Sequence, residues 1–352
     1  MRSDLAAKGA SPPLLSILLP VYNVAPYLEE CVQSIISQVD RHDIEIILLD
    51  DASTDGSYAL CQSLCQQHGS LLKLLQHTKN RGLSAARNSL LDASTGTYIW
   101  FIDSDDVMLP SALKDLCAIL DNASPDMILC DYEQNGRHFR CFTGKAESLE
   151  TDTEKLIAGV FEARKLHAWS KISRRSLWEK SHQFPEGKCF EDIATTPWLL
   201  LNAQSYYYVP KPWIYYRVRA GSIISMVSHK SAAFDDRKND DLAQAMHGFP
   251  EYFQSRLPGA SLETRLLISH FLAKEYTKIV HRLIKCLWNH DHVAVILMKM
   301  NRYNLMMQEG SPMPFREVAR EYYKRGKIVR WLVTLLCLYL GSLRGTQKRL
   351  PK

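Results

Sequence analysis

The sequence lacks the features that mark several common classes of protein. Its nine cysteines, an odd number, are scattered along the chain and include no CxxC pair, so neither a zinc site of that spacing nor a disulfide framework is indicated. We interpret them as reduced thiols of a cytosolic protein. There is no internal repeat and no low-complexity tract. No signal-peptide cleavage site follows the apolar residues near the N-terminus, so we do not expect export.

Long apolar runs are also missing. The apolar stretch from Ile328 to Leu340 is shorter than the roughly 20 residues that cross a bilayer comfortably. Basic residues lie at both of its ends, namely Lys324, Arg325, Lys327, Arg330, Arg344, Lys348 and Arg349. This pattern favours a helix over about 328–343 that lies in the interface of an anionic membrane. A C-terminal core helix is the alternative.

What is present is typical of a folded globular protein: 46% of the 352 residues are hydrophobic and 23% are charged. This length suits one large domain or two ordinary ones. The net charge of +5 is unevenly distributed. From Arg256 to the end there are 18 Lys and Arg and 6 Asp and Glu, whereas the part before Arg256 has 25 Lys and Arg and 32 Asp and Glu. We assign the basic part to a membrane surface and expect no nucleic-acid contact. The expected location is the cytoplasmic face of a bacterial inner membrane, as a peripheral protein.

From Leu14 to Tyr132 short apolar runs alternate with segments of helical periodicity. Strands are predicted at 14–20, 44–50, 71–77, 98–103 and 126–132, with amphipathic helices between them. Apolar strands separated by such helices indicate an α/β fold with a mostly parallel central sheet covered on both faces. A further strand-like segment is found at 205–222, and the pattern after Ser231 is mostly helical.

Three of the predicted strands end in polar loops. The loops are "PVYN" at 20–23, "DDASTDGS" at 50–57 and "DSDD" at 103–106. Because ligands of parallel sheets lie beyond the carboxyl ends of the strands, we expect all three loops to open on one edge. The run of carboxylates at 103–106 is costly unless a cation or a reaction uses it, so it marks a candidate site.

Four motifs carry a resemblance to a known family. They are "SILLPVYNVAPYLEECVQSIISQ", "EIILLDDASTDGS", "NRGLSAARN" and "YIWFIDSDD", and "FEDIATTPWLL" extends the match to about residue 200. In this order and spacing they resemble the family 2 glycosyltransferases, which are inverting enzymes of the GT-A (nucleotide-diphospho-sugar transferase) fold. The resemblance gives little help after residue 230, where the sequence pattern places a soft boundary. We therefore expect a catalytic domain over 14–230, followed at 231–352 by a mostly helical, basic region.

The resemblance also implies a nucleotide-sugar donor, most simply a uridine one. The family's base contacts correspond to Tyr22 and Asp51, and Pro20 begins the same loop. As alternatives, Tyr22 is an aromatic at the edge of the core and Asp51 is a helix cap or turn residue. Arg87 belongs to a helix that the small Ala85 lets approach the sheet, and it either meets a phosphate, holds the acidic loop or is an ordinary surface arginine.

Asp103 and Asp105 form the DxD motif of the resemblance, with Asp105 the direct ligand of a divalent cation. Mg²⁺ and Mn²⁺ prefer hard oxygen ligands, commonly one or two carboxylates together with substrate phosphates and water. A cation here would neutralise charge on the departing nucleoside diphosphate. Asp106 is expected to cap the following turn.

An inverting transfer also needs a base for the acceptor hydroxyl, which belongs to a growing glycan or glycolipid. In the family this base is the aspartate of an ED pair, here Asp192 after Glu191; alternatively, both are ordinary acids in the first turn of a helix. Trp169, Lys171 and Arg217 have counterparts in many relatives, which implies an acceptor or leaving-group pocket. A core aromatic and solvated cations are the alternative for these three.

Two other classes compete with this interpretation. The segment "WFIDSDDVML" also fits the DxD of haloacid-dehalogenase-like phosphatases, in which Asp103 would be a phosphoryl nucleophile and Asp105 an acid or base. That motif normally follows the first strand, whereas here three strand and helix units precede it. A non-catalytic nucleotide-sugar-binding protein is the second alternative, against which the intact Asp105 and Asp192 argue.

Overall fold

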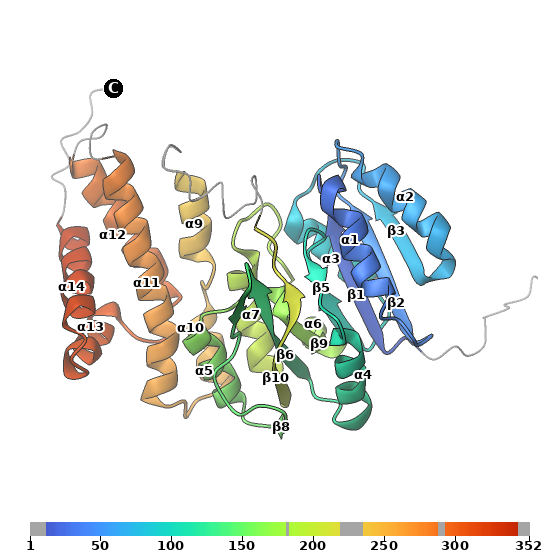
Figure 1. Ribbon diagram of the computed structural model, residues 1–352. Coiled ribbons are helices and arrows are strands. Elements are labelled where there is room, and N and C mark those ends of the chain that lie inside the picture. Colours follow the sequence, from blue (N-terminus) through green and yellow to red (C-terminus); the bar gives the residue numbers. More distant parts are fainter. Residues whose placement is uncertain (1–11, 181–182, 219–234, 288–292, 344–352) are drawn as a thin grey trace, which may run out of the picture.

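The computed structural model of the protein describes residues 12–180, 183–218, 235–287 and 293–343 (Figure 1). A sheet of ten strands lies at its centre, in the order β3-β2-β1-β4-β9-β6-β10-β5, with β7 beside β6 and β8 beside β10. The first four strands of this order are parallel: β3 (Leu72–Gln76), β2 (Ile44–Asp50), β1 (Leu15–Val21) and β4 (Tyr98–Phe101).

The second half of the sheet is mixed. β9 (Lys171–Arg174) is antiparallel to both of its neighbours, β4 and β6 (Met127–Gln134), and β10 (Tyr206–Tyr215) is again parallel to β6. The short strands β5 (Val107–Met108), β7 (Arg137–Phe139) and β8 (Leu149–Glu150) are antiparallel. The sequence pattern did not predict β9, because four residues are too few to give a periodic signal.

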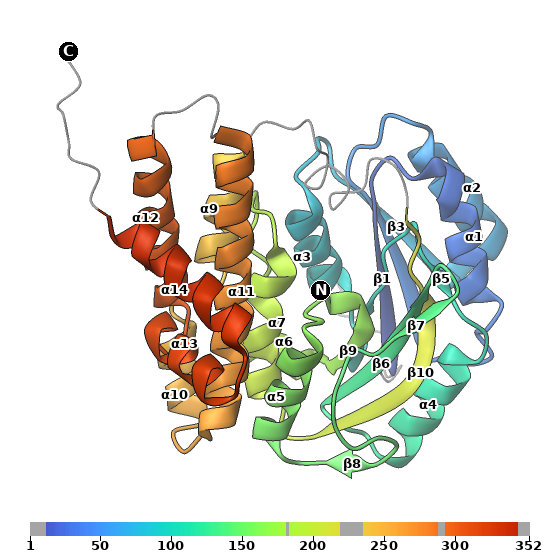
Figure 2. The same cartoon turned by 60° about the vertical axis from the view of Figure 1, so that its left-hand side comes forward.

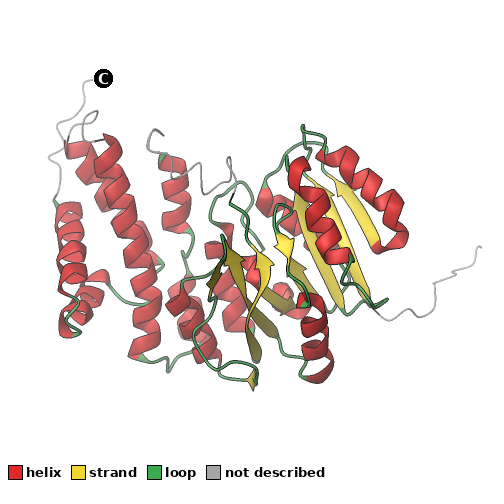
Figure 3. Ribbon diagram, in the orientation of Figure 1, coloured by secondary structure: helices red, strands yellow, loops and turns green. Residues whose placement is uncertain are grey.

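Helices cover both faces of the sheet, as predicted (Figures 2 and 3). One face carries α1 (Ala25–Ile36), α2 (Ser57–His68) and α4 (Ala112–Asn122). The other carries α3 (Leu83–Ala93), α5 (Thr153–Ala163), α6 (Arg175–Lys180) and α7 (Glu191–Asn202). Along β1, Ile17 and Leu19 pack in the core on the α1 side of the sheet, and Leu18 packs in the core on the α3 side. This is expected because successive side chains of a strand alternate between faces. Short 3₁₀ helices η1 (Gly69–Leu71) and η2 (Ala168–Ser170) precede β3 and β9.

The C-terminal region is helical, as predicted. It contains α9 (Asp236–Gln244), α10 (Phe249–Arg256), α11 (Leu262–Leu287), α12 (Val293–Glu309), α13 (Phe315–Lys324) and α14 (Ile328–Ser342). Its apolar residues join the core under α5 and α7; for example, the rings of Phe161 and Phe271 are 5.6 Å apart. The boundary expected near residue 230 falls outside the described residues. Among the described helices, none combines the length and the apolar character that crossing a membrane requires.

Candidate active site

The carboxyl ends of the parallel strands bring the three polar loops to one edge, which confirms the prediction. β1 is parallel to both β2 and β4, so that Val21 pairs with Asp50 and the loop 103–106 begins on the other side of β1. The Ser104 hydroxyl donates a 2.7 Å hydrogen bond to the Pro20 carbonyl and ties the acidic loop to the first loop.

Tyr22 lies at the open edge of the sheet and is 44% exposed, so it is no part of the core. Pro20 lies inside β1, where it pairs with Leu49, and its side chain is buried. Asn23, next in the chain, accepts a 2.8 Å hydrogen bond from the Thr54 amide and joins the first loop to the second. Tyr22 is therefore the residue of this loop that can offer a ring face to a ligand.

Asp51 is buried and holds the loop that precedes α3. Its carboxylate accepts hydrogen bonds from the amides of Arg81 (2.9 Å) and Gly82 (2.7 Å) and contacts His77 Nδ1 at 2.6 Å. His77 Nε2 in turn lies 2.9 Å from the Ser89 hydroxyl. Gly82 has φ +85°, a conformation that a side chain would strain. Sequence reasoning missed His77, although its position directly after β3 was the available signal.

Arg87 connects the two acidic motifs. Its guanidinium donates hydrogen bonds to Asp103 Oδ1 (3.0 Å), Glu191 Oε1 (3.0 Å) and Asp192 Oδ1 (2.9 Å). The side chain is only 1% exposed. Arg87 is therefore not an ordinary surface arginine. It holds the acidic loop through Asp103, and the same guanidinium also binds both carboxylates of the ED pair.

Aromatic rings and a backbone clamp fix the surroundings of Arg87. The rings of Phe101 and Phe184 lie 5.9 Å and 5.2 Å from its guanidinium carbon. The Asn88 side chain donates to the Phe184 carbonyl (2.9 Å) and accepts from the Phe184 amide (3.0 Å). Ala85 is fully buried, as expected for a helix that approaches the sheet closely. The cation is thus enclosed by groups that leave it little freedom to move.

The acidic loop is electrostatically unfavourable on its own. Burial raises the pKa of Asp103, the negative charge of Asp105 raises it further, and Arg87 opposes both. Burial and the charge of Asp103 raise the pKa of Asp106 to about 9. Asp106 does not cap the following turn as expected; its Oδ1 accepts a 2.9 Å hydrogen bond from the Arg217 amide instead.

The residues of this loop fit a divalent cation that a substrate helps to bind. Among the described residues, no group of three or more His, Cys, Asp or Glu side chains is arranged to enclose a metal ion. Asp103 and Asp105 supply two carboxylates, which is the usual protein share for Mg²⁺ beside phosphates and water. Asp106 Oδ2, beside them, is buried without a hydrogen-bond partner in the described part of the chain, so a polar oxygen of this loop is left for a bound group to satisfy.

Glu191 should make stability depend on pH. Burial raises its pKa from 4.5 to about 7, Asp192 adds to the shift, and Arg87 opposes it. A carboxyl with a raised pKa binds its proton more tightly in the folded state than in the unfolded state. Glu191 therefore contributes fully to the free energy of unfolding below pH 4.5, and this contribution is lost as pH rises through about 7. Glu191→Gln should remove this loss, on the order of 1–3 kcal/mol.

Urea unfolding between about pH 4.5 and 7 measures this effect. The stability of the Glu191→Gln variant should fall less over this range than that of the wild type. Glu162→Gln, at an exposed position of α5, should keep the wild-type slope. Equal slopes for all three proteins would contradict the assignment.

Trp169 and Lys171 lie inside the protein beside this edge. The Trp169 ring is 4% exposed and stacks between His167, at 3.9 Å, and Tyr216, at 5.8 Å. The Lys171 ammonium donates to the carbonyls of Lys165 (2.8 Å) and His167 (2.9 Å), and burial lowers its pKa to about 8. Both residues thus shape the segment that leads into β9.

Arg217 is placed at the acidic loop. Its Nε donates to the Asp105 carbonyl at 3.0 Å and its Nη2 to Glu30 Oε2 at 2.6 Å, while the guanidinium carbon lies 5.1 Å from the Tyr27 ring. Its neighbour Tyr216 carries the stacking contact with Trp169. The end of β10 therefore links the buried aromatic group to the DxD motif.

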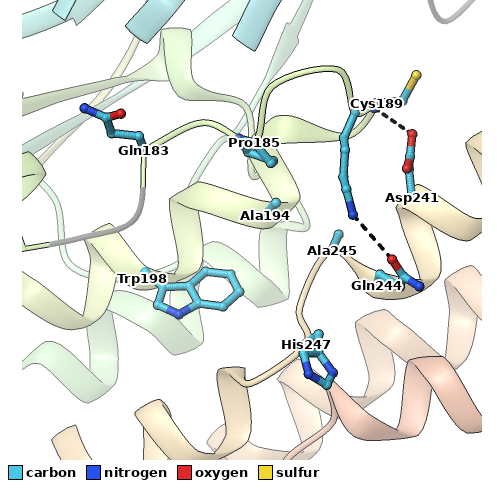
Figure 4. Close-up of a pocket in the computed structure, with 10 residues that line it drawn as sticks. Gln183, Pro185, Cys189, Ala194, Trp198, Asp241, Gln244, Ala245 and His247 are labelled. Carbon is cyan, nitrogen blue, oxygen red and sulfur yellow. Dashed lines mark hydrogen bonds between the residues drawn. The ribbon is translucent and has the colours of Figure 1, made fainter. Parts of the chain in front are cut away.

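A separate pocket lies behind the first turns of α7 (Figure 4). Ala194 and Trp198 line it from α7, and two hydrogen bonds connect the preceding loop to α9: the Cys189 amide to Asp241 (3.0 Å) and Lys188 to Gln244 (3.3 Å). Glu191 and Asp192 do not line this pocket. The two hydrogen bonds hold the loop that precedes Glu191 and Asp192 against α9.

Solved structures define the fold. TarS of S. aureus in complex with UDP-GlcNAc has a TM-score of 0.60 over 93% of this chain and 92% of its own, at 20% identity. The mannosyltransferase PcManGT of Pyrobaculum calidifontis, in complex with GDP-Man and Mn²⁺, has a TM-score of 0.53 over 96% of this chain and 89% of its own, at 16% identity. At these identities the likeness shows the fold, which is the GT-A fold of glycosyltransferases.

Sequence comparison finds a matching family. Residues 16–155, in the N-terminal part of the chain, match the model of "Glycosyl transferase family 2". A β-1,3-glucosyltransferase of Campylobacter jejuni, named for the lipid-linked acceptor GalNAc(5)-diNAcBac-PP-undecaprenol, is 27% identical over 62% of this chain and 70% of its own length. Three other curated bacterial glycosyltransferases match over 32%, 73% and 50% of their length, so the chain spans less than two thirds of two of them.

Proposed function

We propose that the protein is a metal-assisted inverting glycosyltransferase, which transfers a sugar from a nucleotide donor, most simply UDP-linked, to a hydroxyl of a glycan or lipid-linked oligosaccharide. The observation that carries this proposal is the single Arg87 guanidinium bound to Asp103 of the DxD motif and to Asp192 of the ED pair. An inverting transfer needs a leaving-group site and a base held in a fixed relation, and this contact supplies such a relation.

On the donor side, the exposed ring of Tyr22 is suited to stacking on a flat base. Asp51 orders the loop 77–82 beside it through the amides of Arg81 and Gly82. Asp103 and Asp105 would hold Mg²⁺ or Mn²⁺ together with the pyrophosphate oxygens, and a bound cation would neutralise charge on the leaving nucleoside diphosphate. Arg217, which contacts the Asp105 carbonyl, adds positive charge at the same loop.

On the acceptor side, we assign the general base to Asp192. It lies in the first turn of α7, and its Oδ1 accepts a 2.9 Å hydrogen bond from Arg87. An ionised carboxylate can accept the proton of the attacking hydroxyl as the new bond forms. Glu191, whose pKa is raised to about 7, is the alternative base. Trp169 and Lys171, which are buried, would not contact the acceptor directly but would support the protein segments that form the acceptor side.

Removal of Asp105 tests the metal assignment. Asp105→Ala should reduce Mn²⁺-dependent transfer to the background rate, because it removes a carboxylate ligand of the cation. Nucleoside diphosphate release at saturating donor is the measurement. Asp115→Ala removes an aspartate of α4 that pairs with Lys211, and it should retain full activity. Normal turnover of Asp105→Ala in the presence of a chelator would show that the metal assignment is wrong.

We also propose that the protein works peripherally at the cytoplasmic face of a bacterial inner membrane. An acceptor carried on a lipid would be presented there, and the C. jejuni relative is named for such an acceptor. The basic C-terminal region supports this location, with 18 Lys and Arg against 6 Asp and Glu from Arg256 onward.

A further inference from the structure

Helix α14 exposes apolar side chains where a surface helix ordinarily carries polar ones. Val329, Leu332, Val333, Leu336 and Tyr339 are between 45% and 75% exposed and follow one another at helical spacing. Such a contiguous apolar surface usually marks an interaction site.

The opposite side of α14 is firmly packed. Cys337 and Leu338 are buried, and the Tyr276 hydroxyl of α11 donates a 3.1 Å hydrogen bond to the Cys337 carbonyl. A Cβ on Gly341 would lie 2.9 Å from the same hydroxyl, so the two helices approach closely at this point. The helix is therefore anchored to the core on one side and available for contact on the other.

A groove between α13 and α14 borders this apolar surface. Arg316 and Arg320 of α13 line one wall, and the α14 wall consists of Trp331, Leu335, Leu338, Tyr339 and Ser342. The two arginines are exposed, lie one helical turn apart, and form no ion pair or hydrogen bond with any residue that the structure describes. Tyr323 lies near one end of the groove, with its ring 4.9 Å from that of Trp331.

More cations surround the same surface. Lys324, Lys327 and Arg330 are all exposed near the start of α14. The acids of α13 are fewer: Glu321 pairs with Lys324, and Glu317 is exposed. The surface thus combines an apolar ridge, aromatic rings and a net positive rim, and anionic lipid complements all three: acyl chains meet the ridge, the interface suits the aromatic rings, and phosphate groups meet the rim.

A second copy of the chain would fit this surface less well. In a two-fold symmetric dimer each surface meets its own equivalent, so Arg316, Arg320 and Lys327 would face the same cations of the other copy. Like charges brought together at an interface oppose association. An anionic leaflet, in contrast, binds more tightly with every cation that approaches it.

We propose that the α13–α14 groove binds the phosphate of an anionic phospholipid through Arg316 and Arg320, while the apolar ridge of α14 enters the headgroup boundary of the leaflet. Two guanidinium groups one turn apart supply paired donors suited to phosphate oxygens. Trp331 and Tyr339, which line the groove, are of the two residue types that are enriched at membrane interfaces. This inference extends the proposed peripheral location and is independent of the transfer chemistry, whose residues lie elsewhere in the fold.

Sedimentation of the full-length protein with vesicles tests the inference. Vesicles of phosphatidylglycerol mixed with phosphatidylcholine should bind the wild type, and vesicles of phosphatidylcholine alone should bind it far less. The double variant Arg316→Gln, Arg320→Gln should bind the anionic vesicles roughly 30-fold more weakly, because each cation near an anionic leaflet contributes about fivefold. Leu332→Ser with Leu336→Ser should also reduce binding, and added salt should weaken it in the wild type.

The matched control is Lys278→Gln with Lys285→Gln, which removes the same charge from α11 outside the groove and should bind like the wild type. Nucleoside diphosphate release and thermal unfolding, measured on every variant, should stay unchanged, so that failure of the transfer proposal is separated from failure of this one. Wild-type binding by the Arg316, Arg320 variant would overturn the headgroup site. A concentration-dependent dimer that ignores vesicles and is broken by Leu332→Ser with Leu336→Ser would overturn the membrane assignment.

Discussion

Replacing Arg87 with methionine should lower the free energy of unfolding by about 3–5 kcal/mol, the usual cost of removing one partner from a buried ion pair. Arg87 is 1% exposed and binds Asp103, Glu191 and Asp192. Without it, three carboxylates at this site lose their common cation. Urea unfolding at neutral pH measures the change, and transfer should be lost as well, because neither acidic motif keeps its position.

Arg41→Met is the matched control. Arg41 also bridges two carboxylates, Asp43 and Asp121, but at the surface, where its side chain is 28% exposed. Its removal should cost less than about 1 kcal/mol. If Arg87→Met proves too unstable to study, Arg87→Lys keeps the charge without the planar fork and should reduce transfer at a smaller loss of stability. Equal, small losses for Arg87→Met and Arg41→Met would contradict the central role of Arg87.

Asp192→Asn should reduce the rate of transfer by about 10²–10⁴-fold, the usual contribution of a general base. The amide keeps an oxygen that can accept the hydrogen bond from Arg87, so the fold and the donor side should change little. The measurement is a comparison of the rate at saturating acceptor with the affinity for nucleoside diphosphate. The rate should fall while the affinity stays close to that of the wild type.

Glu191→Gln is the informative partner of this variant, since Glu191 binds the same Arg87 nitrogen. It should retain most of the transfer rate at neutral pH if Asp192 is the base. If Asp192→Asn transferred at the wild-type rate and Glu191→Gln did not, the base would be Glu191.

The sequence predicted the elements whose signals are local. The apolar runs at 14–20, 44–50 and 98–103 became β1, β2 and β4, and their polar ends meet at one edge. A helix predicted between the strands at 71–77 and 98–103 is found there as α3 (Leu83–Ala93). These predictions held because strand alternation, helical periodicity and the common edge of parallel strands follow from residues close together in the chain.

Contacts between distant residues were beyond the sequence pattern. Arg87 meets Glu191 and Asp192 across more than one hundred positions, and nothing in the helix around Arg87 selects those partners over a phosphate. The role of Asp106 was likewise mispredicted, since its partner is the amide of Arg217, 111 residues away. Such pairings depend on how β9 and β10 are inserted into the sheet, and β9 is too short to be predicted from periodicity.

The C-terminal helix shows why the two interpretations of its sequence were hard to separate. α14 buries Cys337 and Leu338 in the core and exposes Val329 and Leu336, so it has features of both a core helix and an interface helix. An apolar run that is hydrophobic on every side carries no periodic signal to indicate which side is buried. Packing against α11, α12 and α13 decides which side is buried.

Incubation of the full-length protein with a panel of nucleotide sugars and Mn²⁺, with nucleoside diphosphate release as the measurement, is the most direct test of the proposed transfer. We predict slow release from a uridine diphosphate sugar, faster release with an acceptor, and none with a chelator or in Asp105→Ala. Binding of the nucleotide sugar without release would indicate a non-catalytic protein. Hydrolysis of a phosphate ester without any release from nucleotide sugars would indicate a phosphatase, and either result would contradict the account.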